Sequence, residues 1–157
     1  MYGSYEKELL LTQANNDASL ATAIAVEAGA GVKNTWSIFE PMTVTRFGIQ
    51  VTVAFNYDTL VTLGILKLKK YVVYGSSAGE VTLATIELTD GLAAGTVVYV
   101  DVDNALGKAN IKAGEQLVAE VTTQGNGGTE TGDYTIFVCG NPRAEVAANQ
   151  AYMVNQT

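Results

Sequence analysis

Short segments in which apolar and polar residues alternate, separated by glycine-containing turns, dominate this sequence from Trp36 onward. The turns recur about every 8 to 15 residues, and the segments between them are rich in Val, Thr, Ile and Tyr. Alternation places apolar side chains on one face of a strand, whereas an amphipathic helix needs them three and four residues apart. The pattern therefore predicts an all-β sandwich or barrel.

The clearest predicted strand runs from Thr43 to Phe55. Its large apolar residues occupy alternate positions, which predicts one buried face made of Phe47, Ile49, Val51, Val53 and Phe55. The range 63–74 alternates leucine with lysine and is predicted to be a half-exposed strand. In 81–88 the alternation changes phase, which predicts a β-bulge near Ala84 or Thr85.

Further short strands bring the predicted number to about eight, which is what the two four-stranded sheets of a jelly roll require. They are expected at 36–39, 96–103, around Ile111, 117–123 and 134–139. We therefore expect an antiparallel β-sandwich, in the first place an eight-stranded jelly roll, with a seven-stranded immunoglobulin-like sandwich as the alternative. The glycine-rich segment Gly125–Gly132 lacks the pattern of a phosphate-binding loop and is expected to be a loop tip.

The sandwich is expected to occupy residues 35–140, with an N-terminal arm over 1–34 and a C-terminal arm over 141–157. Within the N-terminal arm, Ser19–Glu27 fits both a strand and a short helix, and the strand is favoured. Both arms are expected to become ordered on a partner surface. The first eight residues lack the basic and apolar regions of a signal peptide, so no export signal is expected.

The charge balance narrows the classes of partner. The 157 residues include 16 acidic and 9 basic side chains, which gives a formal net charge of -7. This sign opposes binding to a phosphate backbone or to an anionic membrane surface. No apolar run approaches the roughly 18 residues of a membrane-spanning helix. We expect a soluble protein that binds neither nucleic acid nor membranes.

Histidine is absent, and Cys139 is the only cysteine. These counts exclude Ser-His-Asp and Cys-His nucleophiles, histidine-based metal sites and thiolate clusters. We therefore expect no cofactor, no metal and no enzymatic activity. Cys139 is interpreted as a small buried apolar residue.

Two groups of oxygen-bearing side chains have both a functional and a structural interpretation. Asp101, Asp103 and Asn104 precede Gly107, and such a density of oxygen ligands suits calcium. Their spacing does not match a calcium-binding loop, so a polar turn is favoured. A carboxylate pair for glycoside hydrolysis would have to come from four acids that we expect to be solvated: Asp90, Glu115, Glu120 and Glu130.

Lysines and aromatic residues allow similar alternatives. Lys67, Lys69 and Lys70 form a basic stripe, interpreted as protection of an edge strand, with contact to an acidic neighbour as the alternative. Trp36 and Phe39 are expected in the core, although an exposed tryptophan would be a candidate interface anchor.

Four stretches, taken in order, resemble the small jelly-roll structural proteins of tailed-phage virions, and among them the capsid decoration, or cement, proteins. They are Phe39–Ile49, Asp90–Gly95, Ile111–Val118 and Asn141–Glu145. The resemblance lies in the layout of residues 36–150. It implies a non-enzymatic protein on the outer surface of an icosahedral capsid, often a homotrimer, whose arms clamp adjacent major capsid protein subunits.

On this basis the expected shell contacts lie on the two arms. They are Tyr2, Tyr5, Arg143, Tyr152 and Met153. Deletion of 1–15 or 146–157 is expected to abolish shell binding and to leave the β fold intact. Two further hypotheses use the same fold: a carbohydrate-binding or host-adhesion module with Trp36 or exposed tyrosines as its site, and a calcium-stabilised module with its site at Asp101–Asn104.

Overall fold

The computed structural model describes residues 8–12, 23–26, 28–57, 62–72, 78–125 and 130–143. They form ten strands and one 3-10 turn, η1. In chain order these are β1 Leu9–Thr12, β2 Ile24–Ala25, β3 Lys33–Ser37, β4 Met42–Tyr57, β5 Gly64–Tyr71, β6 Val81–Leu88, β7 Val97–Asp101, η1 Ala105–Gly107, β8 Asn110–Ile111, β9 Gln116–Thr123 and β10 Glu130–Pro142. In this part of the chain, no helix is long and apolar enough to cross a membrane.

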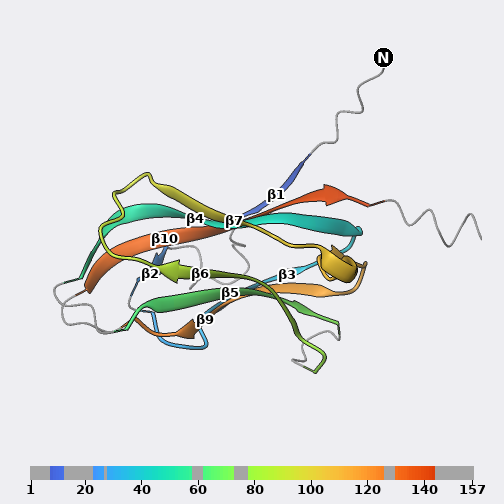
Figure 1. Ribbon diagram of the computed structural model, residues 1–157, viewed down its shortest axis with the longest axis horizontal. Helices are drawn as coiled ribbons and strands as arrows, with labels where there is room; N and C mark the ends of the chain where they lie inside the picture. Colours follow the sequence, from blue (N-terminus) through green and yellow to red (C-terminus); the bar gives the residue numbers. More distant parts are fainter. Residues whose placement is uncertain are drawn as a thin grey trace, which may run out of the picture.

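The strands form two antiparallel sheets that lie face to face (Figure 1). The upper sheet has the order β1-β10-β4-β7, with β2 beside β10 and β8 beside β4, and the lower sheet has the order β3-β9-β5-β6. If the two-residue strands β2 and β8 are set aside, eight strands remain. Numbered along the chain, they are ordered 1-8-3-6 and 2-7-4-5, which is the order of a jelly roll. The jelly-roll prediction is confirmed, and the immunoglobulin-like alternative is wrong.

The core lies between the two sheets and is built from alternate residues of facing strands. Phe47, Ile49 and Val51 of β4 are buried, as their spacing predicts. Leu66 and Leu68 of β5 are buried as well, while the intervening lysines face outward. Burial of each such side chain contributes roughly 1.5–3 kcal/mol, so the alternating pattern itself selects which face of each strand turns inward.

Shifts in strand register change the alternation, and one of them occurs close to a predicted place. The pairing of β5 with β6 shifts between Thr82 and Ala84, so Leu83 is the extra residue, next to the predicted position. Around Val53 the pairing of β4 with β10 shifts twice. The prediction that Val53 faces the core is wrong: its side chain is 47% exposed, because extra residues in β4 break the alternation there.

One strand, β1, occurs where none was expected, and another, β2, occurs where a strand was favoured. The short strands β1 and β2, both within residues 1–34, pair with β10, and Ile24–Ala25 agrees with the strand interpretation of Ser19–Glu27. Because β1 belongs to the sandwich, deletion of residues 1–15 would remove one of its strands as well as the segment before it. The last residues of the expected loop tip 125–132 belong to β10.

Candidate functional site

One end of the sandwich gathers three connections and both ends of the described chain. The β3–β4, β5–β6 and β7–β9 connections all lie there, because the strands they join start or finish at that end. The N–H of Arg143, just after β10, donates to the C=O of Pro41 (2.8 Å). Near the start of β1, Glu8 Oε1 accepts from Thr45 Oγ1 (3.3 Å). We call this the terminus end; it is on the right in Figure 1.

Asn110 holds the β7–β9 connection against both sheets. Its Oδ1 accepts hydrogen bonds from Thr43 Oγ1 (2.8 Å) and Asn104 Nδ2 (3.2 Å). Its backbone C=O accepts from Nζ of Lys70, at the end of β5 (3.1 Å). Asn104 Oδ1 in turn accepts the backbone N–H of Ala109 (2.9 Å). The connection is therefore fixed by polar contacts to β4 and to β5.

The β3–β4 connection is fixed in the same way and turns Phe39 outward. Ile38 exchanges backbone hydrogen bonds with Glu115 (3.1 Å) and Gly114 (2.8 Å), and its side chain is buried. The next residue, Phe39, is 85% exposed, so the expectation that it belongs to the core is wrong. Trp36 is in the core as expected, and its Nε1–H donates to the C=O of Thr12 (2.7 Å).

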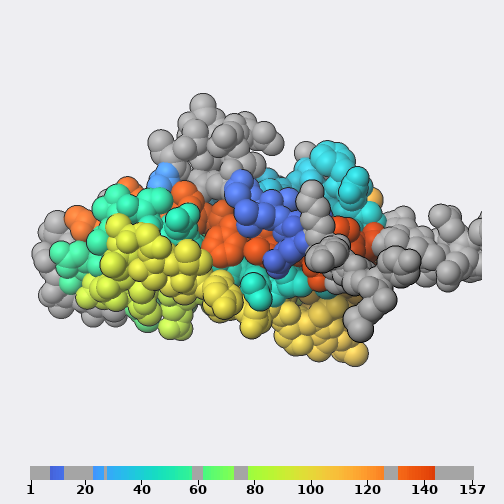
Figure 2. All heavy atoms as spheres, turned by 90° about the horizontal axis from the view of Figure 1, so that it is seen from above, coloured from blue at the N-terminus to red at the C-terminus, as the bar shows by residue number. Residues whose placement is uncertain are grey.

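Leu106 is the second large apolar side chain that projects from this end. It is fully exposed and has φ +57°, in the left-handed region that L-residues other than Asn and Asp rarely adopt. Val72, just after β5, is 48% exposed. In Figure 2 the β3–β4 connection (cyan) and the η1 region (gold) flank the end of β10 (red). Each of the three connections thus contributes one exposed apolar residue.

The residues expected to contact a shell are only partly within the described structure. Arg143 lies at the terminus end and is exposed. Tyr2, Tyr5, Tyr152 and Met153 lie outside the described residues.

The three residues considered as calcium ligands each have another partner. Asp101 pairs with Arg46 of the neighbouring strand (Oδ1 to Nε, 3.4 Å), and Asp103 pairs with Lys108 (Oδ2 to Nζ, 3.1 Å). The hydrogen bond from Lys108 and a backbone N–H lower the pKa of Asp103. The Asn104 side chain accepts the N–H of Ala109 and donates to Asn110 Oδ1. Within the described ranges no three His, Cys, Asp or Glu side chains are grouped to hold a metal ion.

Of the four acids considered for glycoside hydrolysis, the three whose side chains are described do not converge. Asp90 lies at the opposite end of the sandwich, where its carboxylate accepts a backbone N–H of β4 (3.1 Å). Glu115 lies at the terminus end and accepts the N–H of Lys112 (2.8 Å). Glu120 lies on the outer face of the lower sheet. The side chain at position 130 lies outside the description.

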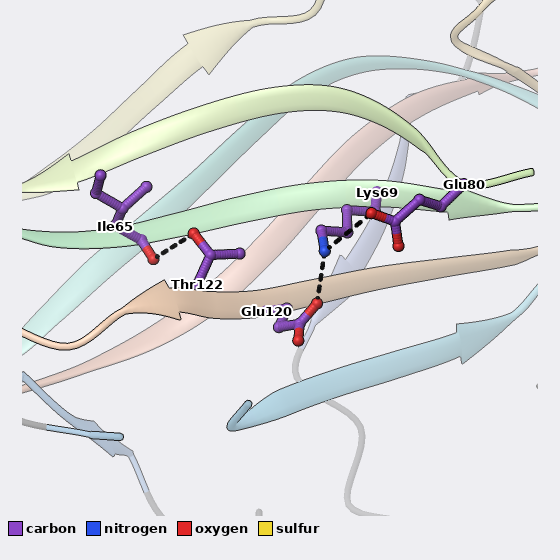
Figure 3. Close-up of polar contacts among 5 residues, drawn as sticks. All are labelled: Ile65, Lys69, Glu80, Glu120 and Thr122. Carbon is purple, nitrogen blue, oxygen red and sulfur yellow. Dashed lines mark hydrogen bonds and ion pairs between the residues drawn. The ribbon is translucent and has the colours of Figure 1, made fainter. Parts of the chain in front are cut away.

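Lys69 joins two carboxylates on the outer face of the lower sheet (Figure 3). Its Nζ lies 2.8 Å from Glu120 Oε2 and 3.3 Å from Glu80 Oε1. The hydrogen bond to Glu120, with a further contribution from Glu80, raises the pKa of Lys69 despite partial burial. Since β5 lies between β9 and β6, the edge-strand interpretation is wrong, and the acidic neighbours of Lys69 belong to its own chain.

Cys139 lies on the outer face of the upper sheet, opposite Leu10 of β1. It is partly exposed, so the expectation of a buried residue is wrong. Partial burial, and to a smaller extent Glu8, raise the pKa of its thiol.

Sequence patterns did not single out Leu106, Val72 or Asn110. Leu106 had a usable signal, since it is a lone leucine between Asp103–Asn104 and Gly107–Lys108, where a turn would otherwise be polar. Asn110 had none, because its partners are distant in sequence.

No known family model matches the chain. No curated protein is similar to it in sequence. Among solved structures, a chain in the "Structure of infectious bursal disease virus Gx strain" is similar with a TM-score of 0.30 and 16% identity. The match covers 87% of this chain and 30% of that chain, so this chain spans less than a third of the other's length. At this TM-score the likeness adds nothing to the fold derived above from strand order.

Proposed function

We propose that this protein is a structural component of a tailed-phage virion that binds the outside of the icosahedral capsid as a homotrimer and stabilises it by bridging major capsid protein subunits. The resemblance of four sequence stretches to decoration proteins supports the proposal. The jelly-roll strand order agrees with it, because this fold builds many viral capsid domains. The same fold serves other functions, so the fold does not carry the argument.

The observation that carries the proposal is the shared position of the two chain ends. Glu8 and Arg143 both lie at the terminus end, so the segments 1–7 and 144–157 both continue from one end of the body. These segments contain Tyr2, Tyr5, Tyr152 and Met153, and aromatic residues and methionine are enriched in protein interfaces. A homotrimer presents three such pairs, which multiplies weak contacts into stable attachment.

The position of Trp36 speaks against carbohydrate binding through this residue, which is one form of the alternative function. A carbohydrate-binding site on Trp36 would need an exposed indole, whereas Trp36 is buried and its N–H is bonded to Thr12. Tyr99 on the outer face of the upper sheet is exposed, with the Arg46 guanidinium 5.3 Å from its ring centre. Glycan binding through Tyr99 is therefore an outcome that the experiment must include.

The test combines native mass with co-sedimentation. The purified chain is expected to be a trimer and to pellet with capsid shells that have been stripped of it. Deletions of 2–7 and of 146–157 spare β1 and β10, so they are expected to keep the β-sheet circular dichroism spectrum and to lose shell binding. A wild-type chain that stays in the supernatant and binds glycans on an array would contradict the proposal. Normal binding by both deletion variants would show that the terminal segments do not attach it.

A further inference from the structure

Three exposed apolar residues of the terminus end lie on or beside connections between strands. Phe39, Val72 and Leu106 come from three connections that the jelly-roll strand order brings to one end. Large exposed apolar side chains grouped in this way mark interaction sites more often than scattered ones do. We call Phe39, Val72 and Leu106 the tip surface.

The backbone beneath the tip surface is fixed before any partner binds. The Asn110 network ties the β7–β9 connection to Thr43 and Lys70, and Ile38 ties the β3–β4 connection to Glu115. A contact residue held in place loses little conformational freedom when it is buried in an interface. Phe39 and Leu106 are thus presented on supported turns.

Leu106 combines complete exposure with an unfavourable backbone conformation. A leucine at φ +57° costs free energy that glycine or asparagine at the same place would largely avoid, and its side chain buries nothing within the described molecule. Strain of this kind is concentrated at binding and catalytic sites. Stability of the isolated chain gives no reason for a leucine here, whereas contact with a partner does.

The distribution of charge separates the two ends. At the terminus end, acidic and basic side chains occur side by side. Asp103 is paired with Lys108. Glu40 directly follows Phe39, and Arg143 directly follows β10. At the opposite end, the described residues include Glu87, Asp90 and Asp133, and the described connections there contain no Lys or Arg. The acidic end is therefore suited to solvent, and the terminus end suits a surface of low net charge.

We propose that the tip surface is the docking face of this protein, and that its partner is a protein surface with apolar recesses and little net charge that receives Phe39 and Leu106. The inference rests on the proposed function, under which that surface is the outside of the capsid shell. The acidic end then points away from the shell, and Phe39 and Leu106 are the central anchors of the contact.

The test measures binding of full-length variants to stripped capsid shells. Phe39→Ser and Leu106→Asn are each expected to weaken binding roughly tenfold or more. Leu106→Asn is expected to melt at or above the wild-type temperature, because asparagine tolerates positive φ, so lost binding cannot be ascribed to unfolding. Val97→Thr is the matched control: Val97 is 51% exposed on the outer face of β7, away from the tip surface, and its replacement is expected to leave binding unchanged.

The outcomes separate the two proposals. If Phe39→Ser and Leu106→Asn both bind shells as the wild type does, the tip surface is not the docking face, while the capsid role stands. If only Val97→Thr loses binding, docking takes place through the face of the upper sheet instead. A wild-type chain that does not bind shells would remove the capsid role and the shell as partner together. Dissociation of the wild-type oligomer by Leu106→Asn in sedimentation velocity would identify a second copy of this chain as the occupant, and would also overturn the inference.

Discussion

Lys69 forms ion pairs with two carboxylates at once. Its side chain is largely buried between Glu80 and Glu120, so Lys69→Gln would leave two carboxylates near each other without their shared cation. We expect the free energy of unfolding in urea to fall by about 1–2 kcal/mol, less than for a fully buried pair because both acids retain some contact with water. Lys67→Gln, two residues earlier on the same face, is the control and should cost clearly less. Equal losses would show that the ion pairs contribute nothing specific.

Tyr134 differs from Lys69, because its polar atom is buried without a stabilising hydrogen bond among the described residues. Its hydroxyl is buried and has no hydrogen-bond partner among the described residues, while its ring packs edge-on against Phe55. Tyr134→Phe keeps the ring and removes the unsatisfied hydroxyl. Thermal and urea unfolding should therefore show unchanged or increased stability, by up to about 1 kcal/mol. A clear loss would indicate that an internal water satisfies this hydroxyl.

At the scale of elements, β1 pairs with β10 in the upper sheet and also accepts a hydrogen bond from the lower sheet. It has only four residues at the edge of the upper sheet, and the Trp36 indole of the lower sheet donates to the C=O of its last residue, Thr12. Trp36→Phe removes this hydrogen bond and should lower stability by about 1 kcal/mol or more, with some loss of packing. Amide hydrogen exchange should accelerate more in β1 than in β4 and β9. Uniform acceleration would show that Trp36 supports the core alone.

For the whole molecule, four groups with raised pKa values predict a loss of stability at alkaline pH. The pKa values of Cys139, Tyr71, Tyr134 and Lys69 are all raised, chiefly by burial for the first three and by the hydrogen bond to Glu120 for Lys69. A group whose pKa is higher in the folded than in the unfolded state contributes stability below its unfolded value and loses it as pH rises. The ordinary pKa values, which apply to the unfolded chain, are 9.0 for the thiol, 10.0 for the tyrosines and 10.5 for the lysine.

The melting temperature should therefore be nearly constant from about pH 6 to 8 and should fall above about pH 9. Tyr134→Phe should make this alkaline fall shallower, because a buried tyrosine that resists ionisation is removed. A melting temperature that stays constant to pH 10.5 would contradict the raised pKa values of these four groups.

Local alternation explains where sequence-based prediction succeeded. The inward faces of β4 and β5 followed from period-two spacing, because each strand chooses its buried face from its own residues. The same argument failed at Val53, where bulges set by pairing with β10 interrupt the period. It also failed at Phe39, because the exposure of a residue just after a strand depends on its neighbours, and here Ile38 is the residue bonded to Gly114 and Glu115, in the turn before β9.

The sequence by itself determined the all-β class, the position of most strands and the side of each that is buried, because these depend on side chains only a few residues apart. The tertiary structure decided which strands are neighbours, that Lys69 lies on an inner strand, and that Leu9–Thr12 completes the upper sheet. It also brought the tip surface together at the terminus end. Contacts such as Thr43 with Asn110 join residues 67 positions apart, and only the path of the whole chain through two packed sheets brings such residues within bonding distance.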